Sequence, residues 1–219
     1  MVTPDDSILK AAVSRIIHNA DLRETALPRS PAIRLLLLDG DYPQGELSSD
    51  EMRRIMDNPL YWVFCWASGQ VLAEFLLADR NWVADKRVLD FGSGSGVVAI
   101  AAAMAGAREV IACDCDPMAL EATRVNAARN GVQLQTVQDF HAVRGPIDLI
   151  IVADVLYDRA NLHWLTLFAQ RAEVVLLADS RIKDFDHPAY RAIARESSCT
   201  MPDLDESAQF RDVRIYCSA

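Results

Sequence analysis

The amino-acid sequence predicts an α/β fold with a doubly wound, mostly parallel sheet, preceded by an N-terminal helical extension. From residue 68 onward, short apolar runs alternate with segments of helical periodicity, which is typical of a parallel sheet. The runs at residues 147–153 and 174–178 are almost continuously apolar, as expected of strands covered on both faces. Pro117 and Gly131 stand at the start and just past the end of one intervening helix, where these residues are favoured.

The expected elements follow one another along the chain. Strands are expected at residues 87–91, 110–113, 132–137, 147–153, 174–178 and 213–217. Helices are expected at residues 7–19, from about 68 to 79, and at 94–105, 117–130 and 161–171. Ligands of such sheets bind beyond the carboxyl ends of the strands, so chemistry is expected there.

Residues 1–60 differ in character from the rest of the chain. They combine a helical stretch, a proline-containing connection and an apolar run at residues 33–38, and they close at Pro59 with an aromatic cluster. No low-complexity linker separates them from residue 61 onward. We therefore expect residues 1–60 to be an extension packed on the core, and residues 61–219 to form the main domain, a size that suits one α/β unit.

Charge and length exclude several classes of partner. The 219 residues carry 22 Lys and Arg against 31 Asp and Glu, a net charge of −9, whereas nucleic-acid binding needs a dense cationic patch. No apolar run reaches membrane-spanning length, and the acidic start lacks the apolar core of a signal peptide. We expect a cytoplasmic monomer that binds neither nucleic acid nor membranes.

The cysteines and histidines do not predict a metal site. The five cysteines show no C-x-x-C spacing, and the four histidines are dispersed. A structural zinc site needs its ligands in closer groups. We expect free thiols and no metal.

A glycine-rich turn at residues 88–96 is the first part of a candidate ligand site. It contains Gly92, Ser93, Gly94 and Gly96 after a short apolar strand that carries Asp90. Glycines allow the backbone to approach a ligand closely. The spacing departs from the G-x-G-x-x-G pattern of dinucleotide-binding turns, and no G-x-x-x-x-G-K-[ST] sequence is present. An NTPase phosphate loop is therefore excluded.

Two further elements follow at the spacing of a nucleoside-binding site. Asp114 ends an apolar strand 22 residues after Gly92, and a carboxylate there can accept hydrogen bonds from both ribose hydroxyls. Asp116, before Pro117, is more typical of a helix N-cap. After the next strand, Asp139 can accept from an adenine amino group while the ring of Phe140 lies against the base. Each residue alone has an ordinary structural explanation, but three elements in order favour a nucleoside.

The chain resembles the class I, seven-β-strand methyltransferases that use S-adenosylmethionine. From residue 59 to 157 it is similar to their protein-lysine branch, and within it to the enzymes that modify the electron-transfer flavoprotein β subunit. The similar segments are P-L-Y-W-V-F-C-W-A-S-G-Q at residues 59–70, residues 88–96, C-D-C-D-P at 113–117 and A-D-V-L-Y at 153–157. The last matches a D-x-x-Y/F signature that follows the fourth strand in this branch.

This resemblance implies a Rossmann-like seven-stranded sheet, S-adenosylmethionine as cofactor with S-adenosylhomocysteine as product, and a lysine acceptor. It also implies that Trp66 and the backbone at Ala153 contact the cofactor, and that Asp90 reaches its amino group. Asp154 and Tyr157 are expected at the acceptor, where they would orient the amine. A purely structural alternative is that Asp154 caps the following helix and Tyr157 packs.

Three other functions remain open at this point. The relatives that modify the flavoprotein carry D-P-G-R after the fifth strand, whereas this chain reads A-D-S-R-I-K at residues 178–183. This departure leaves room for a small-molecule N-methyltransferase of the nicotinamide type, whose flat substrate the aromatic run at residues 61–66 could sandwich. A NAD-dependent oxidoreductase fits the glycine spacing poorly. A non-catalytic binding module would need a damaged cofactor site, and none is visible.

Overall fold

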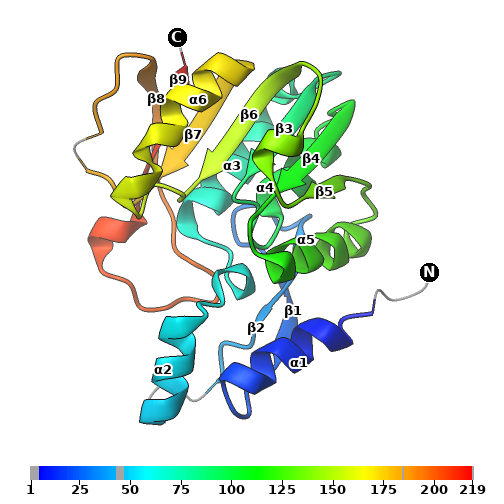
Figure 1. Ribbon diagram of the computed structural model, residues 1–219, viewed down its shortest axis with the longest axis vertical. Coiled ribbons are helices and arrows are strands. Elements are labelled where there is room, and N and C mark those ends of the chain that lie inside the picture. Colours follow the sequence, from blue (N-terminus) through cyan, green and yellow to red (C-terminus); the bar gives the residue numbers. More distant parts are fainter. Residues whose placement is uncertain (1–4, 43–46, 184, 219) are drawn as a thin grey trace.

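The computed structural model, which describes residues 5–42, 47–183 and 185–218, is built around a seven-stranded sheet (Figure 1). The strand order is β5-β4-β3-β6-β7-β9-β8, and β9 runs antiparallel to both of its neighbours while the five strands from β5 to β7 are parallel. The strands are β3 Arg87–Phe91, β4 Glu109–Cys113, β5 Gln135–Val137, β6 Ile147–Ala153, β7 Ala172–Asp179, β8 Tyr190–Ser197 and β9 Asp212–Ser218. The predicted doubly wound, mostly parallel sheet is confirmed.

Helices cover both faces of the sheet. On one face α3 (Ala67–Ala78) and α4 (Val97–Met104) bury their apolar side chains against the strands, with α5 (Pro117–Arg129) beside them. On the other face α6 (His163–Arg171) contributes Leu165 and Phe168 to a second core. Short 3-10 helices connect these elements: η2 Tyr61–Val63, η3 Arg80–Trp82, η4 Phe140–Ala142, η5 Arg159–Leu162 and η6 Ala208–Arg211.

The N-terminal region contains a two-stranded sheet as well as helices. Its elements are α1 Ser7–Ile16, the antiparallel pair β1 Leu22–Ala26 and β2 Arg34–Leu38, and α2 Ser49–Asp57. β2 lies against α5, and a third core fills the space between them. The buried Asn126 of α5 joins the two parts: its Oδ1 accepts from Leu36 N at 2.7 Å, and its Nδ2 donates to Ser95 O, in the glycine-rich turn, at 2.9 Å.

Several element boundaries differ from the sequence predictions. The strand expected at 132–137 forms only at Gln135–Val137, because β5 is an edge strand that pairs with three residues of β4. The helix expected at 94–105 begins at Val97, since residues 92–96 form the turn. The first helix ends at Ile16 rather than residue 19, and the one expected at 161–171 begins as the 3-10 helix η5. β1, β2, α2 and β8 were not predicted.

The chain reverses its direction of sheet growth between β3 and β6. From β3 it proceeds outward through β4 to β5, and then returns to place β6 and β7 on the other side of β3. The carboxyl ends of β3 and β6 therefore flank the crevice where open α/β sheets bind ligands. Asp116 caps α5 as expected, accepting from Met118 N at 2.8 Å, and Gly131 has a φ of 67°.

In the part of the chain that the structure describes, no helix is long and apolar enough to cross a membrane. The first four residues of the acidic start, on which part of the localisation prediction rested, lie outside the described residues.

Candidate functional site

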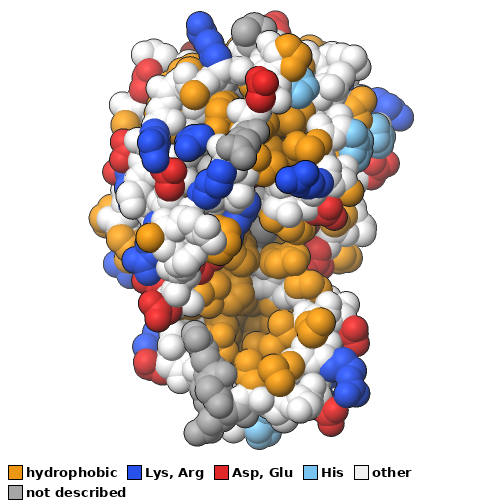
Figure 2. Space-filling model, turned by 90° about the vertical axis from the view of Figure 1, so that its left-hand side faces the viewer, with side chains coloured by type: hydrophobic (Ala, Val, Ile, Leu, Met, Phe, Trp, Pro, Cys, Tyr) orange, Lys and Arg blue, Asp and Glu red, His pale blue; other side chains and the backbone are white. Residues whose placement is uncertain are grey.

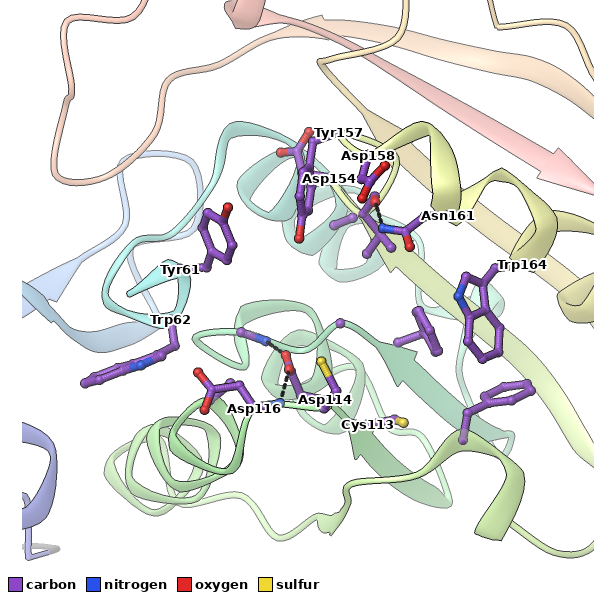
Figure 3. Close-up of a pocket in the computed structure, with 18 of the residues that line it drawn as sticks. Tyr61, Trp62, Cys113, Asp114, Asp116, Asp154, Tyr157, Asp158, Asn161 and Trp164 are labelled. Carbon is purple, nitrogen blue, oxygen red and sulfur yellow. Dashed lines mark hydrogen bonds between the residues drawn. The ribbon is translucent and has the colours of Figure 1, made fainter. Parts of the chain in front are cut away.

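A cavity of about 880 Å³ opens at the carboxyl ends of β3, β4 and β6 (Figure 3). Its size lies within the range of small-molecule sites. Nine of the twelve residues predicted to bind the cofactor or the acceptor line it: Trp66, Gly92, Gly94, Asp114, Asp139, Phe140, Ala153, Asp154 and Tyr157. The tertiary structure thus brings together predicted site residues that are up to 91 positions apart, from Trp66 to Tyr157.

The glycine-rich turn forms one wall of the cavity. Gly92, Gly94 and Gly96 have φ values of 73°, 51° and 83°, which side chains disfavour. A Cβ at Gly92 would stand 2.7 Å from Val155 Cγ2, so this glycine also lets the turn after β6 approach. Gly94 has no side-chain neighbour within 4 Å of a built Cβ, and its backbone is therefore open to a ligand.

Asp114 follows β4 and points at the glycine-rich turn. Its Oδ2 accepts from Gly94 N at 2.9 Å and its Oδ1 accepts from Asp116 N at 3.0 Å. Burial raises the pKa of this carboxyl above its usual value. Each oxygen has accepted one hydrogen bond and can accept another, which suits a pair of ribose hydroxyls.

Three of the predicted cofactor residues do not line the cavity but support its wall. Asp90 is buried inside β3, where its Oδ2 accepts from Ala99 N in α4 at 3.0 Å. Burial raises the pKa of Asp90 to about 7. The Ser93 hydroxyl lies 3.2 Å from the Thr123 hydroxyl, and a Cβ at Gly96 would come within 3.0 Å of the same threonine. These contacts hold the turn against α4 and α5.

The opposite end of the cavity is aromatic. Phe140 is buried, with its ring centroid 5.6 Å from Phe91 and 5.4 Å from Trp164. Asp139 is exposed, and its Oδ1 accepts from His141 N at 2.8 Å, so it caps η4. Trp164, which the sequence analysis did not single out, lies on α6 and lines this end. Flat apolar surface beside exposed acceptors suits a purine base.

Asp154 ties three elements together at the end of β6. Its Oδ1 accepts from Ser68 Oγ at 2.7 Å and from Ser180 N and Oγ at 3.0 and 2.8 Å, and its Oδ2 accepts from Ser68 N at 3.0 Å. Ser68 lies in the first turn of α3 and Ser180 follows β7. The carboxylate is only 8% exposed and caps α3, which precedes it in the chain, rather than the helix that comes after it.

Tyr157 occupies the mouth of the cavity, in the turn that Asp154 holds. Its side chain is 56% exposed, and its ring centroid lies 5.5 Å from that of Tyr61, which is 46% exposed. Burial raises the pKa of the Tyr157 phenol. Sequence reasoning did not assign Tyr61, Ser68 or Ser180, although the first two lie within the aromatic segment at residues 59–70.

Trp66 links this aromatic segment to the cavity. It is the N-cap residue of α3, and its indole Nε1 donates to Tyr61 O at 3.0 Å. The guanidinium of Arg181 lies 5.3 Å from the centre of its ring. Arg181 also pairs with Glu206 at 2.7 Å, so its charge is balanced within the protein.

Nothing in the described ranges resembles a metal centre. No group of three or more His, Cys, Asp or Glu side chains gathers there in a position to hold an ion. Cys113 faces the cavity from β4, but burial raises the pKa of its thiol to about 12, so a thiolate nucleophile is disfavoured. The groups that face the cavity therefore suit an organic cofactor: the uncovered Cα of Gly94, the Asp114 carboxylate as an acceptor, and the apolar rings of Phe140 and Trp164.

Comparison with known proteins shows two related groups. Residues 75–167 match the model of the ribosomal protein L11 methyltransferase (PrmA) family. The electron transfer flavoprotein beta subunit lysine methyltransferase of Xenopus laevis is 33% identical over 195 residues, covering 85% of this chain and 78% of that protein. The rat protein of the same name is 35% identical over 152 residues, which cover 65% of this chain and 60% of that protein.

Solved structures share the fold at lower sequence identity. Magnesium protoporphyrin IX methyltransferase from Synechocystis PCC 6803 with bound SAM superposes with a TM-score of 0.52 at 20% identity, covering 81% of this chain and 86% of that one. The ribosomal protein L11 methylase of Lactobacillus delbrueckii subsp. bulgaricus gives 0.51 at 22% identity, covering 69% and 78%. At these identities the likeness concerns the fold.

Proposed function

We propose that this chain, which belongs to the family of the electron transfer flavoprotein beta subunit lysine methyltransferases, methylates lysine side chains of a protein substrate. It is an S-adenosylmethionine-dependent methyltransferase. The electron-transfer flavoprotein β subunit is the leading candidate acceptor. The departure at residues 178–183 lies beside the cavity mouth, since Ser180 binds Asp154 and Arg181 lines the cavity.

The roles proposed for the residues of the cofactor side follow from which of them face the cavity. When bound, the cofactor would supply an electrophilic methyl group for transfer to a neutral amine, with S-adenosylhomocysteine as the leaving group. Asp114 would accept from the ribose hydroxyls, and Phe140 with Asp139 would receive the base. The turn at Gly92 and Gly94 provides close backbone approach. Asp90, Ser93 and Gly96 keep this turn in place.

On the acceptor side, the hydrogen bonds make Asp154 a positioning residue. Its four accepted bonds hold α3, the exit of β7 and the turn that carries Tyr157 in one arrangement. In-line transfer needs the amine held close and aligned, and a turn that is held to both α3 and the exit of β7 favours this. The amine must be neutral to react, so its proton leaves to water before the attack.

The observation that carries the lysine proposal is the open mouth of the cavity. Tyr61 and Tyr157 are both about half exposed there, and the exposed Asp158, next to Tyr157 in the chain, also lines the cavity. On the side of the molecule that carries α2, Figure 2 shows apolar side chains gathered in a hollow. Asn58 and Pro59, which follow α2 in the chain, line the cavity. An open mouth beside an apolar surface suits a side chain presented by a protein.

Radiolabelled methyl transfer tests this proposal. The chain is incubated with recombinant electron-transfer flavoprotein β subunit and labelled S-adenosylmethionine, and mass spectrometry then locates added methyl groups. We expect label in the protein on lysine, and markedly less label at the same cofactor concentration with Asp114→Ala, which weakens cofactor binding. Label found only in a nicotinamide-like small molecule of a cell extract would contradict the proposal.

The proposal extends to the N-terminal region, the cellular location and the partners. Residues 1–60 are an extension that supports α5 and the glycine-rich turn, through contacts such as those of Asn126. The protein acts in the cytoplasm, as a monomer. It has no nucleic-acid partner, in keeping with the net charge of −9.

A further inference from the structure

Tyr61 is held at the mouth of the cavity by its neighbours in the chain. Trp62 and Val63, the next two residues of η2, are fully buried in the core beneath α5, with Trp62 only 1% exposed. This burial turns the ring of Tyr61 toward the cavity. The Tyr61 carbonyl accepts from Trp66 Nε1 at 3.0 Å, which fixes the backbone as well.

Tyr61 and Tyr157 together form a continuous aromatic wall. Figure 3 shows the two rings next to each other, across the opening from Asp114. Their centroids are 5.5 Å apart at an interplanar angle of 49°, which is direct ring contact. No flat molecule fits between rings that touch, so this pair cannot sandwich a nicotinamide-like ring. A ligand instead lies against their outer surface.

The chemistry of this wall suits a cation. Faces of tyrosine rings attract ammonium groups electrostatically. The third nearby ring, Trp66, has its face occupied by the Arg181 guanidinium at 5.3 Å. The exposed ring surface of Tyr61 and Tyr157 remains, and the exposed carboxylate of Asp158, next to Tyr157 in the chain, also lines the cavity.

We propose that Tyr61 and Tyr157 bind the alkylammonium end of the acceptor as it enters the cavity, and that Tyr61 determines specificity for a cationic acceptor. This inference rests on the proposed lysine acceptor and adds a residue to its binding site. The ring face of Tyr61, not its hydroxyl, makes the contact. Replacing the ring by an aliphatic side chain therefore removes recognition, whereas removing the hydroxyl does not.

The proposal is tested with two small ligands, tetramethylammonium chloride and the neutral neopentyl alcohol, which is similar in size and shape. The full chain is first saturated with S-adenosylhomocysteine. Titration is followed by tryptophan fluorescence, against sodium chloride at equal ionic strength. We expect the cation to bind at least about tenfold more tightly than the alcohol in the wild type and in Tyr61→Phe. In Tyr61→Leu the Kd for the cation should rise by roughly 2- to 30-fold.

Controls separate recognition from folding and from the proposed function. Ile193→Ala removes an exposed apolar side chain on β8, away from the cavity, and should leave cation binding unchanged. Unchanged affinity for S-adenosylhomocysteine shows that Tyr61→Leu is folded. Equal cation binding in Tyr61→Leu and wild type, no preference over the alcohol, or no binding at all would overturn the inference. Failure of lysine methylation with intact cation preference would instead reject only the lysine proposal.

Discussion

Replacing Asp154 by Asn tests whether this carboxylate holds the acceptor side of the site together. Asn tolerates the left-handed backbone that Asp154 adopts, with a φ of 50°, so the change leaves the turn unstrained. The amide oxygen can still accept from Ser180 and the Ser68 hydroxyl. The amide NH₂, however, then faces Ser68 N, a buried donor that is left without an acceptor.

The expected loss of stability follows from these contacts. Leaving the buried Ser68 N–H without an acceptor costs about 1–3 kcal/mol. Removing a negative charge from the start of α3 costs about 0.3–1 kcal/mol more. Together these lower the free energy of unfolding by roughly 1–4 kcal/mol. Turnover should fall while the affinity for S-adenosylmethionine is kept, because the acceptor side is disturbed and the cofactor side is not.

The loss should also depend on pH, through Asp179. Burial, and then the charge of Asp154, raise the pKa of Asp179 to about 6. A carboxyl whose folded pKa is raised contributes stability below its unfolded pKa and loses it as the pH rises through the folded value. At pH 8 Asp179 is ionised and repels Asp154 in the wild type, and Asp154→Asn relieves this repulsion. The variant should therefore lose more stability at pH 5 than at pH 8.

Urea unfolding followed by circular dichroism at both pH values measures these differences. The matched control is Asp116→Asn, because Asn caps a helix as well as Asp does and Met118 N keeps its acceptor. Calorimetry with S-adenosylhomocysteine and initial rates complete the comparison. Surface substitutions usually change the free energy of unfolding by no more than about 0.5 kcal/mol. If Asp154→Asn stays within this range of the wild type at both pH values, the reasoning is refuted.

Three further substitutions test the cofactor side, and a fourth experiment tests independence from metals and disulfides. Asp114→Ala removes the acceptors for two ribose hydroxyls, so calorimetry should show a Kd for S-adenosylmethionine raised about 10- to 150-fold. The wild type should not bind NAD. An unchanged Kd in the variant would remove Asp114 from the site. Gly92→Ala places a Cβ 2.7 Å from Val155 Cγ2, at a φ of 73° that side chains disfavour. Thermal unfolding should therefore show a free energy of unfolding lowered by roughly 1–3 kcal/mol. A variant as stable as the wild type would contradict this geometry of the turn. Burial raises the pKa of Asp90 to about 7, against 3.8 in the unfolded chain, so the free energy of unfolding of the wild type should fall as the pH rises from 3.8 to 7. Asp90→Asn should flatten this dependence of stability on pH. Identical stability–pH curves for variant and wild type would show that Asp90 is ionised in the folded protein throughout this range. Activity should survive both EDTA and reductant, and loss restored by zinc or magnesium would reveal a missed ligand set.

The sequence alone was sufficient for the strands and turns whose signals are local. β3 and β6 have the bounds predicted, because each is a short, mostly apolar run with turn residues directly after it. The start of α5 was predicted from Asp116 and Pro117, because an N-cap carboxylate followed by proline is a local signal for the start of a helix. β8, in contrast, is an edge strand with mostly exposed side chains, so it carries no apolar alternation to detect.

The cofactor side of the site was also accessible from the sequence. Gly94, Asp114 and Phe140 each follow a strand, and a parallel sheet brings such positions to one edge. The positions of strand ends along the chain are therefore enough to predict that these residues line one cavity.

The tertiary structure was needed wherever one side chain finds its partner in a distant element. Asp154 binds Ser68, 86 residues earlier, and Ser180, 26 residues later, and no local pattern specifies either pairing. Tyr61 reaches Tyr157 because its neighbours Trp62 and Val63 are buried beneath α5. Hydrogen bonds and ring contacts of this kind depend on how helices and strands pack, which local sequence patterns do not encode. The sequence was enough to predict the residues that are proposed to bind the cofactor, whereas packing decided which side chains lie at the cavity mouth, where the acceptor is proposed to bind.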